Sequence, residues 1–105
     1  MLQFDERSNG SEIQLNTGKK FEIILRENRT TGFRWHLVSG GEPACKLLDD
    51  SFEIGGGSPG SGGIHSWQFQ AMQEGLGKID LVYQRSWERN KPPAQSFTLN
   101  VHART

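Results

Sequence analysis

The chain has 105 residues, the size of one domain, and we expect a single domain over residues 1–105. Lys and Arg together number 12, as do Asp and Glu, so the formal net charge is zero. This balance argues against a general binder of nucleic acids or membrane surfaces, because such proteins usually carry a basic excess. No apolar stretch approaches the roughly 20 residues of a membrane span. The one cysteine, Cys45, forbids an internal disulfide and is expected in the core.

Apolar and polar residues alternate along most of the chain, which predicts strands, because successive side chains of a strand point to opposite faces. Over residues 44–54 the pattern is less regular and is interpreted as one strand with a bend, although residues 42–50 could also hold a helical turn. Short strands separated by Gly-, Asn- and Pro-containing turns are typical of an all-β fold, here an immunoglobulin-like antiparallel β-sandwich of about seven to eight strands with Greek-key connections. The expected strands cover about residues 12–16, 19–27, 33–39, 44–54, 64–72, 77–84 and 96–103.

The connections between these strands differ strongly in composition. If consecutive strands run in opposite directions, the connections at 28–32, 55–63 and 85–95 share one end of the sandwich. That end then carries a Thr-Thr-Gly turn, a loop with six of the chain's 13 glycines, and a loop with Trp87 and two prolines. A rigid scaffold that presents three distinctive loops together is typical of a binding protein.

Each loop also has a plainer interpretation. The segment 28–32 could be an ordinary turn, and the glycine-rich segment a flexible linker. Alternatively, the glycines let the backbone approach a partner closely. A phosphate-binding loop is excluded, because a strand-like segment follows where a Lys-Ser/Thr and a helix are required. Trp87 is either a buried anchor of its loop or an exposed contact flanked by arginines, as in interface hot spots.

Catalysis and metal binding have little support in the sequence. The three histidines, His36, His65 and His102, lie on three different predicted strands. No His, Cys, Asp or Glu residues have the spacing of a metal site or of a nucleophile with its base. We therefore expect neither an enzyme nor a protein that binds a cofactor or metal.

Taken in order, the three loops resemble those of the chagasin-type inhibitors of papain-like cysteine peptidases. That family carries N-P-T-T-G, G-x-G-G and R-P-W motifs on three neighbouring loops of an immunoglobulin-like sandwich. The similarity extends over about residues 16–103. The counterparts in this chain are Asn28, Arg29, Thr30, Thr31 and Gly32; Gly60, Ser61, Gly62 and Gly63; and Arg85, Ser86 and Trp87.

The resemblance implies a reversible, tight-binding inhibitor that acts as a monomer, with a papain-like cysteine peptidase as its partner. By this resemblance, Thr30 and Thr31 sit over the catalytic cysteine and histidine of the peptidase. Residues 60–63 lie along one side of the cleft through their backbone, and Arg85 and Trp87 cover the other side.

Two positions depart from the family pattern, because Arg29 and Ser86 replace its prolines. Proline restricts the conformations of an unbound loop, which is worth about 0.4–1 kcal/mol where its geometry fits. The sequence therefore predicts that both loops are looser when free, and that Arg29→Pro tightens binding modestly.

Other functions and the compartment stay open at this stage. The main alternative is a carbohydrate-binding or adhesive immunoglobulin-like module with Trp87 as a stacking platform, although the loops offer no second aromatic. A purely structural immunoglobulin-like domain would leave the three loops unexplained. The N-terminus has no basic and apolar leader pattern. The location is thus cytoplasmic if Met1 is the natural start, and periplasmic or secreted if it is not.

Overall fold

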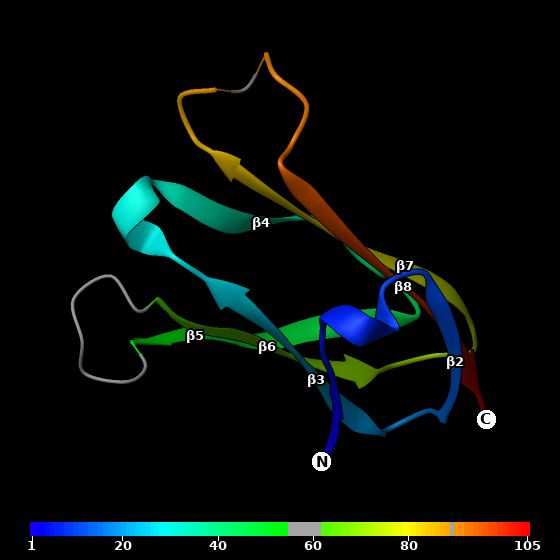
Figure 1. Ribbon diagram of the computed structural model, residues 1–105. Helices are drawn as coiled ribbons and strands as arrows, with labels where there is room; N and C mark the ends of the chain where they lie inside the picture. The colour runs from blue at the N-terminus through cyan, green and yellow to red at the C-terminus, as the bar shows by residue number, and fades with distance from the viewer. Residues whose placement is uncertain (55–61, 89) are drawn as a thin grey trace.

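Two four-stranded sheets pack face to face in the computed structural model, which describes residues 1–54, 62–88 and 90–105 (Figure 1). One sheet has the strand order β1 (Leu2–Phe4), β3 (Lys20–Glu27), β6 (Gly63–Ala71), β5 (Cys45–Ile54). The other has the order β2 (Ser11–Asn16), β8 (Gln95–Arg104), β7 (Gly75–Arg85), β4 (Phe33–Gly40). Two short 3₁₀ turns, η1 (Glu6–Ser8) and η2 (Arg29–Thr31), complete the described elements.

All seven predicted strands are present, and the all-β sandwich is confirmed. β1 was not predicted, because three residues are too short to display an alternating pattern. The helical turn that residues 42–50 could have held is not formed there. Residues 42–44 form a short turn, and the strand β5 begins at Cys45.

The strand pairing is antiparallel, as predicted, except at two edges. β1 pairs with β3, and β2 with β8, in parallel, whereas the remaining pairs are antiparallel. The reason lies in the alternation of direction. β2 and β8 are the first and seventh of the predicted strands and run the same way, so they pair in parallel when their edges meet. β1 precedes these seven strands. By the same alternation it runs opposite to β2 and in the same direction as β3, with which it pairs in parallel.

The core lies between the sheets and is built from the inward-facing residue of each alternating pair. Phe21 of β3 and Phe69 of β6 are paired neighbours in one sheet, and their rings stack on its inner face with centroids 5.4 Å apart. Cys45 is buried there, which confirms its predicted place, and burial raises the pKa of its thiol to about 11. The other fully buried large apolar side chains are Trp67, Phe97, Ile23, Leu25, Ile79, Leu81, Leu99 and Val101.

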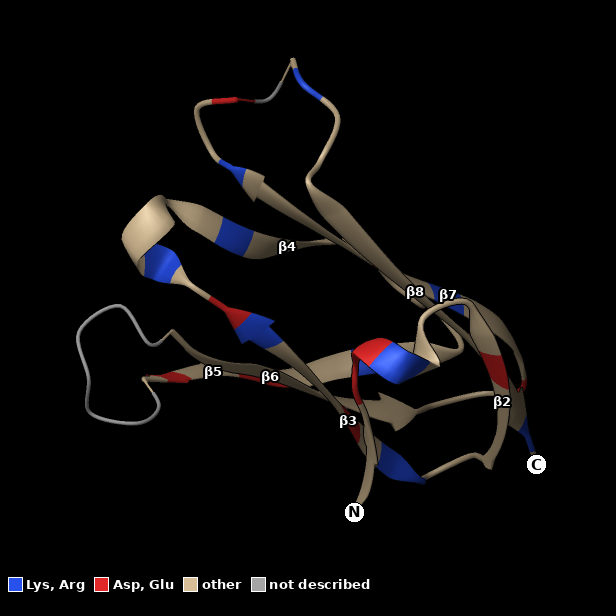
Figure 2. Ribbon diagram, viewed as in Figure 1, with Lys and Arg blue, Asp and Glu red and all other residues tan. Residues whose placement is uncertain are grey.

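The two ends of the sandwich differ. The turn η2, the ends of β5 and β7 and the starts of β6 and β8 lie at one end, away from both termini (Figure 1). Basic and acidic residues are interspersed along the strands of both sheets (Figure 2), in line with the balanced charge. Among the described residues, no helix is long and apolar enough to cross a membrane.

Candidate functional site

The first loop is a turn held by its own polar side chains. The Oδ1 atom of Asn28 accepts hydrogen bonds from the amide of Thr30 at 3.2 Å and from its hydroxyl at 2.6 Å. The Thr31 hydroxyl donates to the Asn28 carbonyl at 2.8 Å. Gly32 closes the turn at a φ of +83° by donating its amide to the carbonyl of Arg29. Thr30 and Thr31 are thereby left exposed at the tip of an ordered turn.

A buried carboxylate lies directly beneath this turn. Glu27, the last residue of β3, is 1% exposed. It accepts hydrogen bonds from the backbone amide of Trp35 at 2.6 Å, from Nε of Arg29 at 2.6 Å, and from Nδ1 of His65 at 3.2 Å. Burial raises the pKa of Glu27, but these three hydrogen bonds outweigh that effect and bring its pKa below the ordinary value. Glu27 therefore ties Arg29 in the first loop to Trp35 on β4 and to His65 on β6.

Arg29, which replaces a proline of the family motif, is held from two sides. Besides its ion pair with Glu27, its guanidinium lies over the ring of Phe52 at 3.9 Å from the centroid. These contacts argue against the expectation that the loss of proline loosens this loop. The side chain supplies the restraint that the proline ring would otherwise supply.

The second loop is described only at its end. The predicted contact residues Gly60 and Ser61 lie outside the described residues. Gly62 has a φ of +80° and lies against the backbone and side chain of Asn28. Gly63 is buried, and a side chain there would clash with the carbonyl of Glu53. Gly63 therefore has a packing reason of its own, which is the close approach of β6 to β5. The reason for glycine at position 62 is its positive φ, since a side chain there would have room.

The third loop contacts the first one directly. The Nε atom of Arg85 donates to the carbonyl of Thr31 at 2.9 Å, and its Nη1 donates to Glu88 at 3.1 Å. The guanidinium also lies 4.5 Å from the centroid of Phe33. The side chain of Trp87 lies against Gly32, where a Cβ atom would clash with the indole ring.

The structure decides between the two interpretations of Trp87. Its side chain is 70% exposed, so the buried-anchor alternative is wrong. One edge of the indole rests on the first loop, and the remainder faces outward. Ser86 beside it is also exposed.

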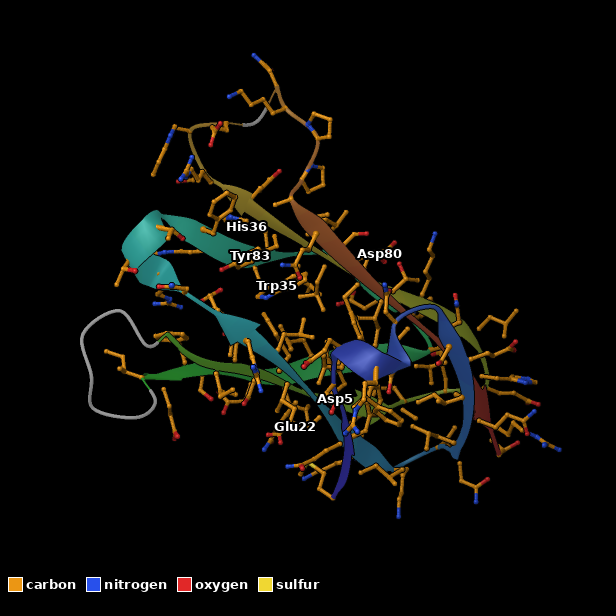
Figure 3. All side chains as sticks on the ribbon, viewed as in Figure 1. Asp5, Glu22, Trp35, His36, Asp80 and Tyr83 are labelled. Atoms are coloured by element: carbon orange, nitrogen blue, oxygen red, sulfur yellow. The ribbon has the colours of Figure 1, made fainter. Side chains whose placement is uncertain are left out.

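Tyr83 on β7 contacts the start of the first loop. Its hydroxyl accepts a hydrogen bond from the amide of Asn28 at 3.0 Å. Its ring packs against those of Phe33 and Trp35, with centroids 5.3 and 5.0 Å away. Figure 3 shows Trp35 and Tyr83 side by side in the space below β4. The aromatic stack thus fixes where the first loop begins.

Sequence reasoning missed three supporting residues, namely Glu27, His65 and Tyr83. The signal for two of them was present in the alternation. The inward set Phe21, Ile23, Leu25 continues to Glu27, and the set Trp67, Phe69, Ala71 begins at His65. A charged or polar residue at an inward position requires a buried partner, which marks it as special.

The assembled site is thus a surface of three adjacent elements. The turn tip, the indole of Trp87 and the start of β6 are joined by direct contacts, and Arg85 and Asn28 are the connecting residues. Within the described part of the chain, no group of three or more His, Cys, Asp or Glu side chains is placed to hold a metal ion.

Comparison with known proteins bears on this arrangement. The model of the Chagasin family peptidase inhibitor I42 matches residues 14–101. Amoebiasin-1 of Entamoeba histolytica is 34% identical over 106 residues, which cover 96% of this chain and 98% of the relative. Chagasin of Trypanosoma cruzi is 26% identical over 100 residues, with 90% and 91% covered.

A solved structure shares the fold. The crystal structure of the cysteine protease inhibitor EhICP2 from Entamoeba histolytica superposes with a TM-score of 0.86 at 24% identity, and the match covers 98% of this chain and 94% of the other. The matching family is one of peptidase inhibitors and not of enzymes. With its family match over most of its length and its close relative, this chain belongs to the chagasin family of peptidase inhibitors.

Proposed function

We propose that this protein is a reversible, tight-binding inhibitor of papain-like cysteine peptidases, acting as a monomer through a single domain over residues 1–105. The observation that carries the proposal is the exposed Thr30-Thr31 tip, which is anchored to its neighbours by Asn28 and Arg85. Such a tip enters a cleft without first having to be ordered, which lowers the entropic cost of binding.

The geometry of the tip explains why it would block a peptidase without being cleaved. A scissile peptide must lie extended with its carbonyl presented to the nucleophile. Here the amide of Gly32 donates to the carbonyl of Arg29, which closes the backbone into a turn. The carbonyl of Thr31 already accepts a hydrogen bond from Arg85 and points into the inhibitor. The tip therefore fills space in front of the nucleophile and offers no substrate-like bond.

The proposed contact residues divide into two groups. Thr30, Thr31, Ser86 and Trp87 are exposed and would touch the peptidase, with Trp87 as the apolar anchor. The second group shapes these loops through internal contacts and consists of Asn28, Arg29, Gly32, Gly62, Gly63 and Arg85. For Gly60 and Ser61 the support is the motif alone.

The sugar-binding alternative gains no support from the described surface. Stacking platforms of that kind usually use more than one exposed aromatic ring. Among the described residues, Trp87 is the exposed large aromatic, whereas Phe33 and Phe52 are partly covered by arginine side chains.

Titration of papain with the purified protein tests the proposal, with trypsin as the serine-peptidase control. We expect stoichiometric loss of papain activity, recovery of that activity on dilution, an intact inhibitor band after incubation, and no effect on trypsin. A 1:1 complex should elute ahead of the free inhibitor in size-exclusion chromatography. No inhibition at micromolar excess across several papain-like enzymes would disprove the proposal.

A further inference from the structure

A buried polar pair links the first loop to the second. Glu27 ends β3 immediately before the first loop, and His65 lies on β6 just after the second. Their side chains meet between the strands, with His65 Nδ1 3.2 Å from Glu27 Oε1. The two residues are 1% and 6% exposed. This contact therefore joins two strands that each carry a loop of the site.

The pair is one part of a longer chain of contacts. The other ring nitrogen of His65, Nε2, contacts the carboxylate of Asp50 on β5, the strand that leads into the second loop. Glu27 in turn binds Arg29 in the first loop. The ring of His65 is held flat against that of Trp67, with centroids 3.9 Å apart and planes 6° from parallel. Its orientation is thus fixed by packing as well as by hydrogen bonds.

Stability alone does not explain this cluster. Burying a carboxylate and an imidazole is costly, and apolar residues of similar size commonly replace such pairs without loss of stability. Moving along β3 and β6 away from the loops, every further inward residue is apolar, beginning with Leu25 and Trp67. The polar pair lies at the loop end of these strands, where Glu27 also bonds Arg29 of the first loop.

We propose that Glu27 and His65 are positioning residues, whose pairing sets the Thr30-Thr31 turn relative to the start of β6. Binding to a peptidase then depends on a contact that lies wholly inside the inhibitor. This inference rests on the proposed function, and it adds two residues that lie outside the three loop motifs.

The test is a double-mutant cycle in inhibition of papain. Glu27→Gln removes the charge and one acceptor oxygen. His65→Phe keeps the stacking on Trp67 but removes both ring nitrogens. We expect each single variant to weaken inhibition about tenfold, and the double variant to be no weaker than the worse single one. Glu22→Gln is the matched control, because Glu22 lies toward the other end of β3 and bonds only Gln3 among the described contacts (Figure 3).

A merely structural role gives a different result. It lowers the melting temperature while the inhibition constants, measured where each variant is fully folded, stay within about twofold of the wild type. Additive losses in the cycle would likewise overturn the proposal, since uncoupled residues cannot act through their pairing.

A second measurement needs no peptidase and separates this inference from the proposed function. In ¹⁵N spectra of the free protein, His65→Phe should shift the amides of Thr30, Thr31 and Gly32 in the first loop. The amides of Gly62 and Gly63 are unsuitable as a readout for Glu27→Gln, because Gly63 pairs directly with Glu27 in the sheet. If the wild type inhibits no peptidase, the proposed function fails, yet these shifts still report the coupling. A His65→Phe spectrum in which the first-loop amides stay unshifted would overturn it.

Discussion

Arg85 and Thr31 lie 54 residues apart in the sequence, yet Nε of Arg85 donates to the Thr31 carbonyl at 2.9 Å. This hydrogen bond joins the end of β7 to the turn tip, so the third loop supports the first. Arg85 also binds Glu88 and covers Phe33. These two contacts hold the planar guanidinium group in one orientation. The arginine of the third motif therefore connects two loops from within the inhibitor.

Arg85→Lys should weaken inhibition, because an ammonium group cannot bond Thr31 and Glu88 in the same planar fork. We expect a loss of about 1–2 kcal/mol in binding, the size of one charge-assisted hydrogen bond. Inhibition constants against papain measure this loss. Arg104→Lys is the control, because Arg104 bonds Gln14 at the end of β8 remote from the loops. Equal effects of the two substitutions would contradict the role given to Arg85.

Trp87→Ala should reduce binding by at least about 1–2 kcal/mol, as truncations of exposed aromatic anchors do. Its melting temperature should stay near that of the wild type, because the side chain is 70% exposed. Leu76→Ala, at a residue 72% exposed, controls for general loss of apolar surface. Full inhibition by the Trp87 variant would show that the indole is not the anchor.

Gly32→Ala should weaken inhibition in addition to lowering stability through backbone strain. A residue with a side chain at this φ of +83° costs about 1–3 kcal/mol, and the added Cβ would also displace the indole of Trp87. Gly18→Ala is a matched control, since Gly18 has a φ of +91° with nothing within 4 Å of a Cβ atom. Both variants should lose similar stability by thermal melting, but only Gly32→Ala should also lose inhibition. A similar loss of inhibition in both would contradict this.

Arg29→Pro should lower both the stability of the fold and the affinity for papain, opposite to the expectation from the sequence alone. The substitution leaves the buried Glu27 carboxylate without one of its three donors, which costs about 1–3 kcal/mol. Thermal melting and inhibition should both report the loss. Ser86→Pro is the comparison, because Ser86 is exposed and the gain expected from proline still applies there. Tighter inhibition by Arg29→Pro would restore the original expectation.

Glu27 also predicts how stability responds to acid. Burial opposes ionisation, but its three hydrogen bonds prevail and hold the pKa of Glu27 below the ordinary 4.5. A carboxylate with a lowered pKa stabilises the fold above its unfolded pKa, and this contribution is lost as the pH falls through the folded pKa. Below about pH 4.5, the unfolding free energy of the wild type should therefore fall more steeply than that of Glu27→Gln. Denaturant titrations at several pH values measure both slopes, and parallel slopes would count against the assignment.

The alternation of apolar and polar residues predicted the strands well, because one face of each strand is buried and successive side chains point to opposite faces. It could not reveal the partners of inward polar residues. Glu27 and His65 are 38 residues apart, and their contact depends on the register between β3 and β6. The same limit applies to Arg29: the structure shows its contacts with Glu27 and with Phe52 on β5, and neither contact is visible in the motif.

The long separation of the contacts around the turn has a consequence for how the inhibitor is made. Asn28 depends on Tyr83, 55 residues away, and Thr31 depends on Arg85, 54 residues away. Such contacts close large loops and form only when the distant strands have come together, which places them late in folding. A short peptide containing the Thr-Thr turn would lack every one of these long-range restraints. The shape of the turn is thus a property of the whole sandwich, and no single segment carries it.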